Sequence, residues 1–371
     1  MSDASPPKNK LPVAALLPGL AAAAAIVAAA LAVHALLGRV LPWEKNPVSA
    51  ILIAMILGLA VRNLLPTPQT FTPGIQFGIK KLLRFGIILM GIRLSIIAVA
   101  RVGVMALAMV ACCIVAGLVV TVLLARTIRI GPRLGALIAA GTSICGVSAI
   151  VAVSPTIDAS EEETAYAIGT ITLFGLLATI VYPYATELVL QLDPAQAGFF
   201  LGTAVHDTSQ VTATALIYDQ LWGVHETGRL AGADVAITTK LVRNTFLVVV
   251  VPLLGCLFGA KSREAGCRKI PLLNYVPLFV FGYVLMAGAR TLGDCIFGDE
   301  TAAWLQSWHA VKSAAFYVIA AAIACVGLNT DIRKMAHLGF RPFVCGFAAA
   351  LTVGAVSFWL VTVLGKWVAA G

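Results

Sequence analysis

The sequence predicts an all-α polytopic membrane protein with about eleven transmembrane helices, and three observations support this. The 371 residues are 60% hydrophobic and only 12% charged, whereas a soluble domain carries about 25% charged residues. Apolar stretches of about 20 residues, the length that spans a bilayer as a helix, recur along the whole chain. Lys and Arg gather between alternate stretches. A soluble fold is excluded, and one transmembrane domain is expected.

The expected spans follow one another with short loops. Their approximate ranges are 11–38, 47–65, 73–97, 101–125, 133–155, 161–188, 195–219, 229–259, 271–290, 305–329 and 340–367. The first is too long for the apolar core of a signal peptide, so it is expected to be retained. It forms an N-terminal extra span, residues 1–45, before two helical units at 46–190 and 191–371.

The charges of the loops predict the orientation. Basic clusters follow the second, fourth, eighth and tenth spans, on the side of Lys8 and Lys10, and the acidic loops Asp158–Glu163 and Asp294–Glu300 fall opposite. Because basic loops stay in the cytoplasm, the N-terminus is expected inside and the C-terminus outside a bacterial inner membrane. The clustered basic residues are Arg62, Lys80, Lys81, Arg84, Arg126, Arg129, Arg133, Lys261, Arg263, Arg268, Lys269, Arg333, Lys334 and Arg341.

Two helix starts can be located from short motifs. Ser160 with Glu163 forms the pattern of a capping box at the start of the sixth span. Asp193-Pro194 places a good N-cap residue before a proline at the first helical position of the seventh.

A weak internal repeat relates the fifth and sixth spans to the seventh and eighth. GTSICGVSAI (141–150) and GTAVHDTSQV (202–211) share Gly-Thr at the start and Ser at the eighth position. An inverted repeat, common in transporters, requires the fifth segment to be re-entrant. That would place Lys261–Lys269 outside, so a repeat of the same direction is favoured. Inversion of a larger unit, five spans against five, stays open.

Three spans place polar groups at one depth. Lys240, Arg243 and Asn244 share one face of the eighth span, and they lie about 15–20 Å from its end, as do Asp207 and residues 142–148. One acidic residue cannot neutralise two cations, so the site is expected to be net cationic and to suit an anion. In the alternative interpretation, Asp207 pairs with one cation and only locks helices together.

The glycines of the fifth span predict a broken helix. Gly141 and Gly146 permit backbone that a helix forbids, and a break exposes N–H groups that bind anions. The alternative is close helix packing through small residues. The expected substrate-binding residues are Thr142, Ser143, Cys145, Gly146, Ser148, Thr203, Thr208, Ser209, Gln210, Lys240, Arg243 and Asn244, and His206 and Asp207 are candidates for coupling or proton transfer.

These motifs resemble a known family. GTSICGVSAI…SP…EEETAYAIGTITLFG, GTAVHDTSQVTATA and TTKLVRNT are similar to the YeiH family of bacterial inner-membrane proteins, the sulfate exporter family. The resemblance extends from about Asn46 to the C-terminus. It implies a multi-span transporter that exports sulfate, sulfite or an organosulfonate.

The leading hypothesis is a secondary transporter of a small anion. No phosphate-binding Gly-x4-Gly-Lys-Ser/Thr motif is present, so coupling to H⁺ or Na⁺ is expected. A cation/proton antiporter that uses Asp207 is the alternative; a passive channel or a membrane enzyme ranks lower. We expect no catalytic residue, cofactor, metal or nucleic-acid partner. The partners are the anion, the coupling ion and the lipid bilayer, and homo-oligomerisation is left open.

Overall fold

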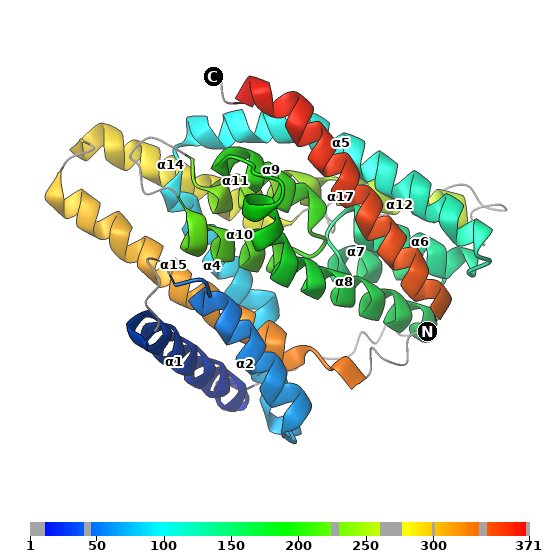
Figure 1. Cartoon of the computed structure of the whole chain (residues 1–371), viewed down its shortest axis with the longest axis horizontal. Helices are drawn as coiled ribbons and strands as arrows, with labels where there is room; N and C mark the ends of the chain where they lie inside the picture. The colour runs from blue at the N-terminus through cyan, green and yellow to red at the C-terminus, as the bar shows by residue number, and fades with distance from the viewer. Residues whose placement is uncertain are drawn as a thin grey trace, which may run out of the picture.

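The computed structural model describes residues 12–40, 46–223, 230–259, 277–298, 301–333 and 340–368. All regular elements in these ranges are helices (Figure 1). In the first part of the chain they are η1 (Val13–Ala15), α1 (Leu17–Val40), α2 (Ala50–Leu64), η2 (Gln69–Phe71), α3 (Thr72–Phe77), η3 (Gly78–Leu82), α4 (Leu83–Met90), η4 (Gly91–Arg93) and α5 (Ile96–Thr127). Then follow α6 (Pro132–Ser143), α7 (Val147–Val153), η5 (Ser154–Thr156), α8 (Glu161–Leu188), α9 (Pro194–Ala204), α10 (Thr208–Trp222), α11 (Gly232–Thr245), α12 (Leu247–Phe258), α14 (Leu278–Phe297), α15 (Ala302–Asn329) and α17 (Phe340–Val368).

Short polar motifs set where two central helices begin. The Ser160 side chain accepts from Glu163 N, and the Glu163 carboxylate accepts from Ser160 N, which is the predicted capping box of α8. Asp193 and Gln196 form a second box at α9, with Pro194 at its first position. Each box satisfies N–H groups that a helix start leaves without an intrahelical partner.

The fifth predicted span is a re-entrant hairpin, which we name hairpin 1. A Cβ atom on Gly141 of α6 would lie 2.9 Å from Cδ1 of Ile150 of α7. Residues nine apart in one straight helix would be separated by about 13 Å along the axis, so the two helices lie side by side. A Cβ on Gly131, before α6, would lie 3.8 Å from Glu163 Oε1, at the start of α8. The chain therefore returns to the end of the molecule from which α6 started, named end 1.

The seventh predicted span is also re-entrant, and we name it hairpin 2. A Cβ on Gly232, at the start of α11, would lie 3.2 Å from the carbonyl oxygen of Pro194 and 3.0 Å from Cδ1 of Tyr218. Ala233 N also donates to Asp219 Oδ1 at 3.2 Å. The start of α9 and the end of α10 therefore lie together beside the start of α11, at what we name end 2.

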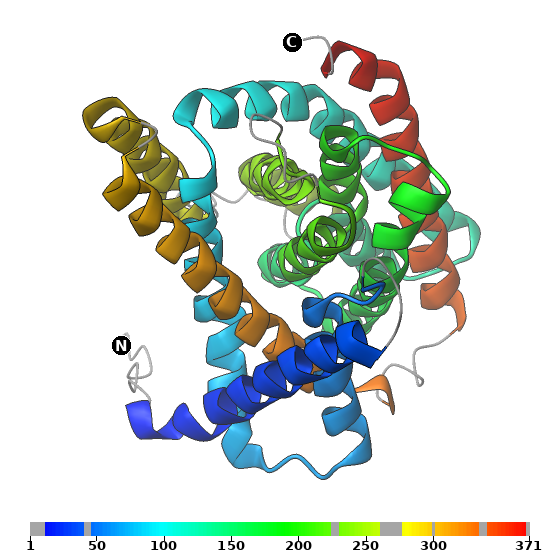
Figure 2. The same cartoon turned by 60° about the vertical axis from the view of Figure 1, so that its left-hand side comes forward.

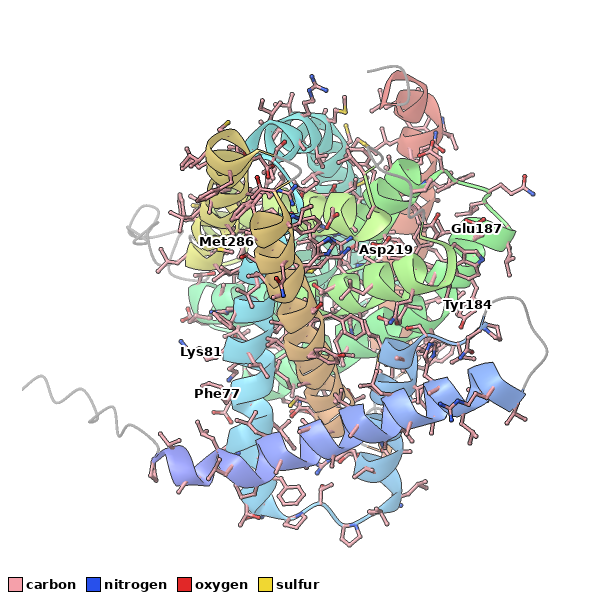
Figure 3. The ribbon with its side chains drawn as sticks, turned by 90° about the vertical axis from the view of Figure 1, so that its left-hand side faces the viewer. Phe77, Lys81, Tyr184, Glu187, Asp219 and Met286 are labelled. Carbon is pink, nitrogen blue, oxygen red and sulfur yellow. The ribbon has the colours of Figure 1, made fainter. Side chains whose placement is uncertain are left out.

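The two hairpins enter from opposite ends of the molecule. α8 begins beside α6 at end 1, and near its other end the Tyr218 hydroxyl of α10 donates to Glu187 at 3.3 Å. Figure 3 shows Tyr184, Glu187 and Asp219 on neighbouring helices of this region. α11 and α12 are bent by 41° at their junction and return the chain to end 1. A Cβ on Gly259, just after α12, would lie 3.0 Å from the carbonyl oxygen of Thr156, which follows α7 of hairpin 1 at end 1. Each hairpin with its following span is an inverted copy of the other.

The expectation of eleven crossings is therefore not confirmed. Within the described ranges, six helices are long and apolar enough to cross a membrane, or seven if the bent pair α11–α12 is one span. α2 has only 15 residues, and the run from α3 to η4 is interrupted by the π-helical turn η3. The orientation in the membrane stays a prediction, and the predicted unit boundary near residue 190 falls between α8 and α9.

The two hairpins also correct the predicted sides of the loops. Glu163 lies against Gly131, which follows Arg126 and Arg129, so the acidic loop at 158–163 lies on the same end as this basic cluster and not opposite it. If one segment is re-entrant and does not cross, every later loop lies on the side opposite to the one predicted. A second re-entrant segment returns the loops that follow it to their predicted sides. The loop charges therefore do not favour a repeat of the same direction over an inverted one; residues 261–269, on which that preference depended, lie outside the described ranges.

The helices form two bundles joined by one apolar core. The hairpin bundle contains α5, both hairpins, α8, α11, α12 and α17, and the frame bundle contains α1 to α4, α14 and α15 (Figures 1 and 2). Within the frame, a Cβ on Gly58 of α2 would lie 2.6 Å from the carbonyl oxygen of Ala324 of α15, which explains the close approach of these helices. The two bundles touch mainly where α14 meets α5 and where α10 meets α2 and α15.

Candidate functional site

The tips of the two hairpins meet inside the hairpin bundle. Residues 144–146 connect α6 to α7, and residues 205–207 connect α9 to α10. A Cβ on Gly146 would lie 2.9 Å from Cβ of Asp207. Gly146 has φ of 67°, a left-handed conformation that L side chains rarely adopt. The predicted break of the fifth span is confirmed, and the seventh span is broken as well. At position 146 glycine is required for its backbone conformation and for space.

Lys240 of α11 binds both tips. Its Nζ donates to the carbonyl oxygens of Ile144 and Val205, each at 2.9 Å, and to that of His206. Ile144 and Val205 occupy the same position in the sequence repeat. The side chain is buried, with 1% exposure. Its three N–H donors are therefore used on backbone.

Arg243, one helical turn further along α11, repeats this arrangement. Its Nε donates to the carbonyl oxygen of Ser143 at 2.8 Å. The two terminal nitrogens donate to the carbonyl oxygens of Thr142 and Thr203, which are also equivalent in the repeat, and a longer bond of 3.3 Å reaches Val205. The side chain has no exposed surface. The guanidinium thus ties the end of α6 to the end of α9.

These contacts give the two cations a structural role that the sequence did not predict. The carbonyl groups at the C-terminus of a helix lack intrahelical partners and carry partial negative charge. Lys240 and Arg243 satisfy such groups on α6 and α9 together, which pins both tips to α11. They do not point into an open cavity. In the described ranges no ion pair joins either of them to Asp207, so the alternative of an internal salt bridge is not observed either.

Asp207 instead caps α10. Its Oδ2 accepts from the backbone N of Ser209 at 2.9 Å and from the Ser209 hydroxyl. The residue is half-buried. An internal carboxylate therefore already occupies the position at which a helix N-terminus binds an anion.

The two repeated threonines bond to their own helices. The Thr142 hydroxyl donates to the carbonyl oxygen of Ile138 at 2.7 Å, and the Thr203 hydroxyl donates to that of Phe199 at 2.7 Å. Both are buried, as is Cys145. The prediction that these threonine hydroxyls are free to hold an anion is not supported, because their protons are already used.

Hydrogen-bonding capacity remains at other atoms of the tips. Four buried atoms there have no partner: Ser143 Oγ, His206 Nδ1, Gln210 Oε1 and Asn244 Oδ1. The amide of Gln210 donates to the carbonyl oxygen of Thr172 of α8 at 3.2 Å. Unpaired buried polar atoms are uncommon in native proteins and require an explanation. Their concentration at the junction distinguishes it from the rest of the core.

The accessible part of the junction comprises Ser148, Asp207 and Thr208. Ser148 is exposed, whereas Thr208 is half-buried and its hydroxyl oxygen accepts from the Asn244 amide at 3.2 Å. That contact leaves the Thr208 proton available to a ligand. Of the predicted site residues, these three are the ones that are not fully buried, and Asn244 is buried beside Thr208.

His206, in the tip of hairpin 2, faces a cavity beside α8 and α17. It lines this cavity of about 160 Å³ with Tyr182 and apolar side chains of α8 and α17, including Phe174 and Phe347. The imidazole is buried, with 1% exposure. Its role as a proton carrier stays a prediction.

Sequence reasoning missed several partners of this site. The Ser357 hydroxyl of α17 lies 2.5 Å from the Thr203 hydroxyl, and the bonds to Ile144, Val205 and Thr172 are made to backbone carbonyls. A lone serine in an apolar span is a weak indication. Carbonyl ligands carry no side-chain signature at all, so nothing in the sequence identifies them.

Comparison with known proteins places the chain in a family. Residues 18–346 match the family described as conserved hypothetical protein 698. A UPF0324 membrane protein of Bacillus cereus is 32% identical over 320 residues, which cover 86% of this chain and 88% of the relative. One from Fusobacterium nucleatum is 31% identical over 339 residues, with 89% and 94% covered. No solved structure matches. The chain therefore belongs to the conserved hypothetical protein 698 family, whose relatives are named as membrane proteins.

Proposed function

We propose that the protein is a secondary active transporter of a small anion, and that the anion binds at the accessible side of the junction between the two hairpin tips. The observation that carries this proposal is the meeting of two re-entrant hairpins that enter from opposite ends. Discontinuous helices that meet in the middle of an inverted repeat are the usual construction of a transport site. The site is then separated from each end by one hairpin, as alternating access requires.

The charge of the junction supports an anion as substrate. Lys240 and Arg243 supply two positive charges, and Asp207 supplies one negative charge. Each tip joins the C-terminus of one helix to the N-terminus of another, so the helix dipoles cancel within each hairpin. One positive charge remains, which a monovalent anionic group would balance. The buried cations would act through their field and through the tip geometry that they hold, not by direct contact.

The hydrogen-bond donors that would meet the anion are those left available at the junction. The hydroxyls of Ser148 and Thr208 are accessible, and the Asn244 amide lies beside that of Thr208. Sulfate, sulfite or an organosulfonate, the substrates implied by the resemblance to the YeiH family, would accept such bonds. Coupling to H⁺ or Na⁺ and a location in the bacterial inner membrane belong to the same proposal.

The proposal is tested by transport measurements in proteoliposomes. Labelled sulfate and sulfite uptake would be measured with and without an imposed pH gradient, for the native protein and for Thr208→Val. The matched control is Thr127→Val, which changes an exposed threonine at the far end of α5. We expect accumulation against the anion gradient that Thr208→Val reduces at least tenfold and Thr127→Val preserves. Absence of flux for both anions and for benzenesulfonate contradicts the proposal.

A second candidate function is favoured by one observation. Asp207 is half-buried and has no ion pair with Lys240 or Arg243, so its carboxylate could bind Na⁺ or a proton. A cation/proton antiporter would lose Na⁺-driven proton flux in Asp207→Asn while Thr208→Val retained it. An anion transporter would lose anion flux in Thr208→Val and would retain it in Asp207→Asn.

A further inference from the structure

A cavity with polar side chains in its walls lies between the two bundles, away from the hairpin tips. It has a volume of about 310 Å³ and is lined by residues of α4, η4, α10 and α15. Leu216, which contributes to it from α10, lies eight residues beyond Thr208, or about 12 Å along the helix toward end 2. Pockets that bind small molecules have volumes of about 300–1,000 Å³, so the cavity is large enough for a compact ligand.

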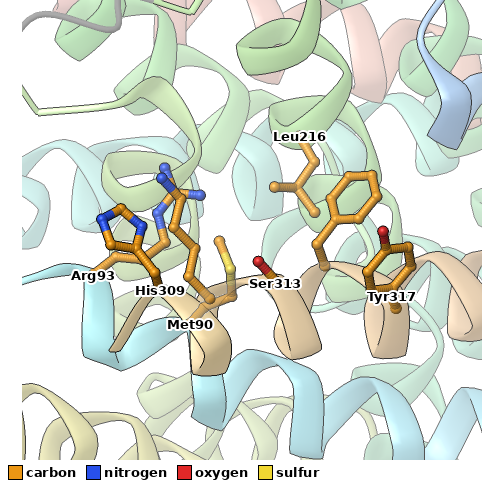
Figure 4. A pocket seen from close by; sticks show the side chains of 8 residues that line it. Met90, Arg93, Leu216, His309, Ser313 and Tyr317 are labelled. Atoms are coloured by element: carbon orange, nitrogen blue, oxygen red, sulfur yellow. The ribbon is translucent and has the colours of Figure 1, made fainter. Parts of the chain in front are cut away.

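The walls of this cavity combine basic and apolar side chains. Arg93, His309 and Lys312 supply the basic groups, and Leu216, Phe316 and Tyr317 supply apolar surface. In Figure 4, Arg93 and His309 lie at one end of the cavity, and Leu216 faces Ser313 and Tyr317 from the neighbouring helix. The cavity therefore has a polar end and an apolar end.

The cavity presents cations while the nearby carboxylates are turned to other partners. Nε of Arg93 lies 2.9 Å from Asp234 Oδ1, and its NH2 lies 3.4 Å from Asp219 Oδ2. Neither carboxylate lines the cavity. Lys312 makes no hydrogen bond or ion pair to any residue in the described ranges; it lies 6.0 Å from the centre of the Trp308 ring, and Asp234 and Asp219 act on it only across space. The Lys312 ammonium is half-buried, and these carboxylates do not take up its three N–H donors, so the donors remain available to an anion.

We propose that this cavity binds a small organic anion, a sulfonate or carboxylate that carries an aryl or short alkyl group. The anionic group lies against Lys312 and His309 within the field of Arg93, and the apolar group packs on Phe316, Tyr317 and Leu216. This binding site is distinct from the hairpin tips. Its identification as a docking position for the transported anion at end 2 depends on the proposed function, but binding itself does not.

Calorimetric titration of the purified full-length protein in detergent with benzenesulfonate tests the proposal. We expect saturable binding that Lys312→Ala weakens about tenfold, because a charge-assisted contact contributes about 1.5–3 kcal/mol and 1.4 kcal/mol corresponds to a tenfold change. Ser313→Phe, which fills the cavity and keeps Lys312, should weaken binding to a similar extent. Lys81→Ala removes the same charge from an exposed position on η3 and should leave the affinity unchanged. Arg93 is unsuitable, because its loss also breaks two ion pairs between the bundles.

The Thr208→Val variant separates this proposal from the proposed function. If benzenesulfonate binding survives in Thr208→Val and is lost in Lys312→Ala, the cavity is a separate site, whatever the transport assay gives. If binding is lost in Thr208→Val and kept in Lys312→Ala, the ligand binds only at the tips and the cavity proposal is overturned while transport stands. Absence of saturable binding to the native protein also overturns it. Inorganic sulfate, titrated in parallel, should bind more weakly because it cannot use the apolar walls.

Discussion

The two hairpins reach the same junction with different local chemistry. In the repeat, Gly146 of hairpin 1 corresponds to Asp207 of hairpin 2. Hairpin 1 turns through a positive φ at Gly146 and has no side-chain cap, whereas hairpin 2 turns through extended backbone and caps α10 with Asp207. Since a Cβ at Gly146 would lie 2.9 Å from Asp207 Cβ, the junction has room for one side chain. The comparison indicates that the asymmetry between the two copies is structural and places a single carboxylate at their contact.

What the hairpins share is their attachment to α11, and its loss should have the largest effect. In Arg243→Met, the carbonyl groups of Thr142, Ser143 and Thr203 lose their Arg243 donor, whereas the Val205 carbonyl keeps its bond from Lys240. Breaking a buried charged network costs about 3–5 kcal/mol, so the free energy of unfolding in mixed detergent micelles should fall by that amount. Arg101→Met, at an exposed position of α5, is the matched control. An unchanged stability of Arg243→Met would show that the cation does not hold the tips.

The turn of hairpin 1 should tolerate no side chain. Gly146→Ala combines a left-handed backbone, which costs about 1–2 kcal/mol in an L residue, with the contact to Asp207. We expect a loss of about 2–3 kcal/mol in unfolding free energy. Gly288→Ala in α14 is the control, because nothing lies within 4 Å of its added Cβ, and it should gain about 0.5–1 kcal/mol. Equal changes in unfolding free energy at the two glycines would show that the turn at position 146 does not require glycine.

The cap of hairpin 2 should matter less than the turn of hairpin 1. Asp207→Ala removes the N-cap of α10 and should cost about 0.5–2 kcal/mol. Asp207→Asn keeps an acceptor for Ser209 N and should be close to the native protein in stability. Urea or detergent unfolding of both variants provides the comparison. If Asn costs as much as Ala, the charge and not the hydrogen bond stabilises the tip.

The smallest expected difference concerns the repeated threonines. Thr203 contacts the Ser357 hydroxyl in addition to its own helix, whereas Thr142 bonds only within α6. Thr203→Ala should therefore cost about 1 kcal/mol more than Thr142→Ala, the usual net contribution of one hydrogen bond. The Ser357→Ala/Thr203→Ala double mutant should recover most of that difference. Additive costs in the double mutant would show that the two hydroxyls do not interact.

Part of this architecture follows from the sequence and part does not. Composition and apolar stretches predict helices and a membrane, and the capping residues Ser160 and Asp193 start α8 and α9 where expected. The glycines predict the break of hairpin 1. Periodicity does not distinguish a broken span from a hairpin, because both contain two short helices joined by a few residues. The direction of the second helix is decided by packing, as between Gly141 and Ile150.

The candidate site was predicted as a set of residues but not as a set of roles. Lys240 and Arg243 were expected to hold substrate because a cation in a membrane span usually marks a substrate path. The structure uses them on backbone carbonyls, which have no signature in the sequence. Asp207, expected to carry coupling, caps a helix. Position along a span is readable from sequence, whereas the partner of a buried charge depends on the tertiary fold.

The most direct test of the two-hairpin architecture is the side of the membrane on which its loops lie. Single cysteines at Arg129 and Asp158, in a background without the native cysteines, would be labelled with a membrane-impermeant thiol reagent in sealed vesicles. These positions precede α6 and follow η5. A re-entrant hairpin predicts that both are labelled from the same side. Labelling from opposite sides would mean that the segment crosses the membrane, and it would contradict the inverted hairpins and the transport site built on them.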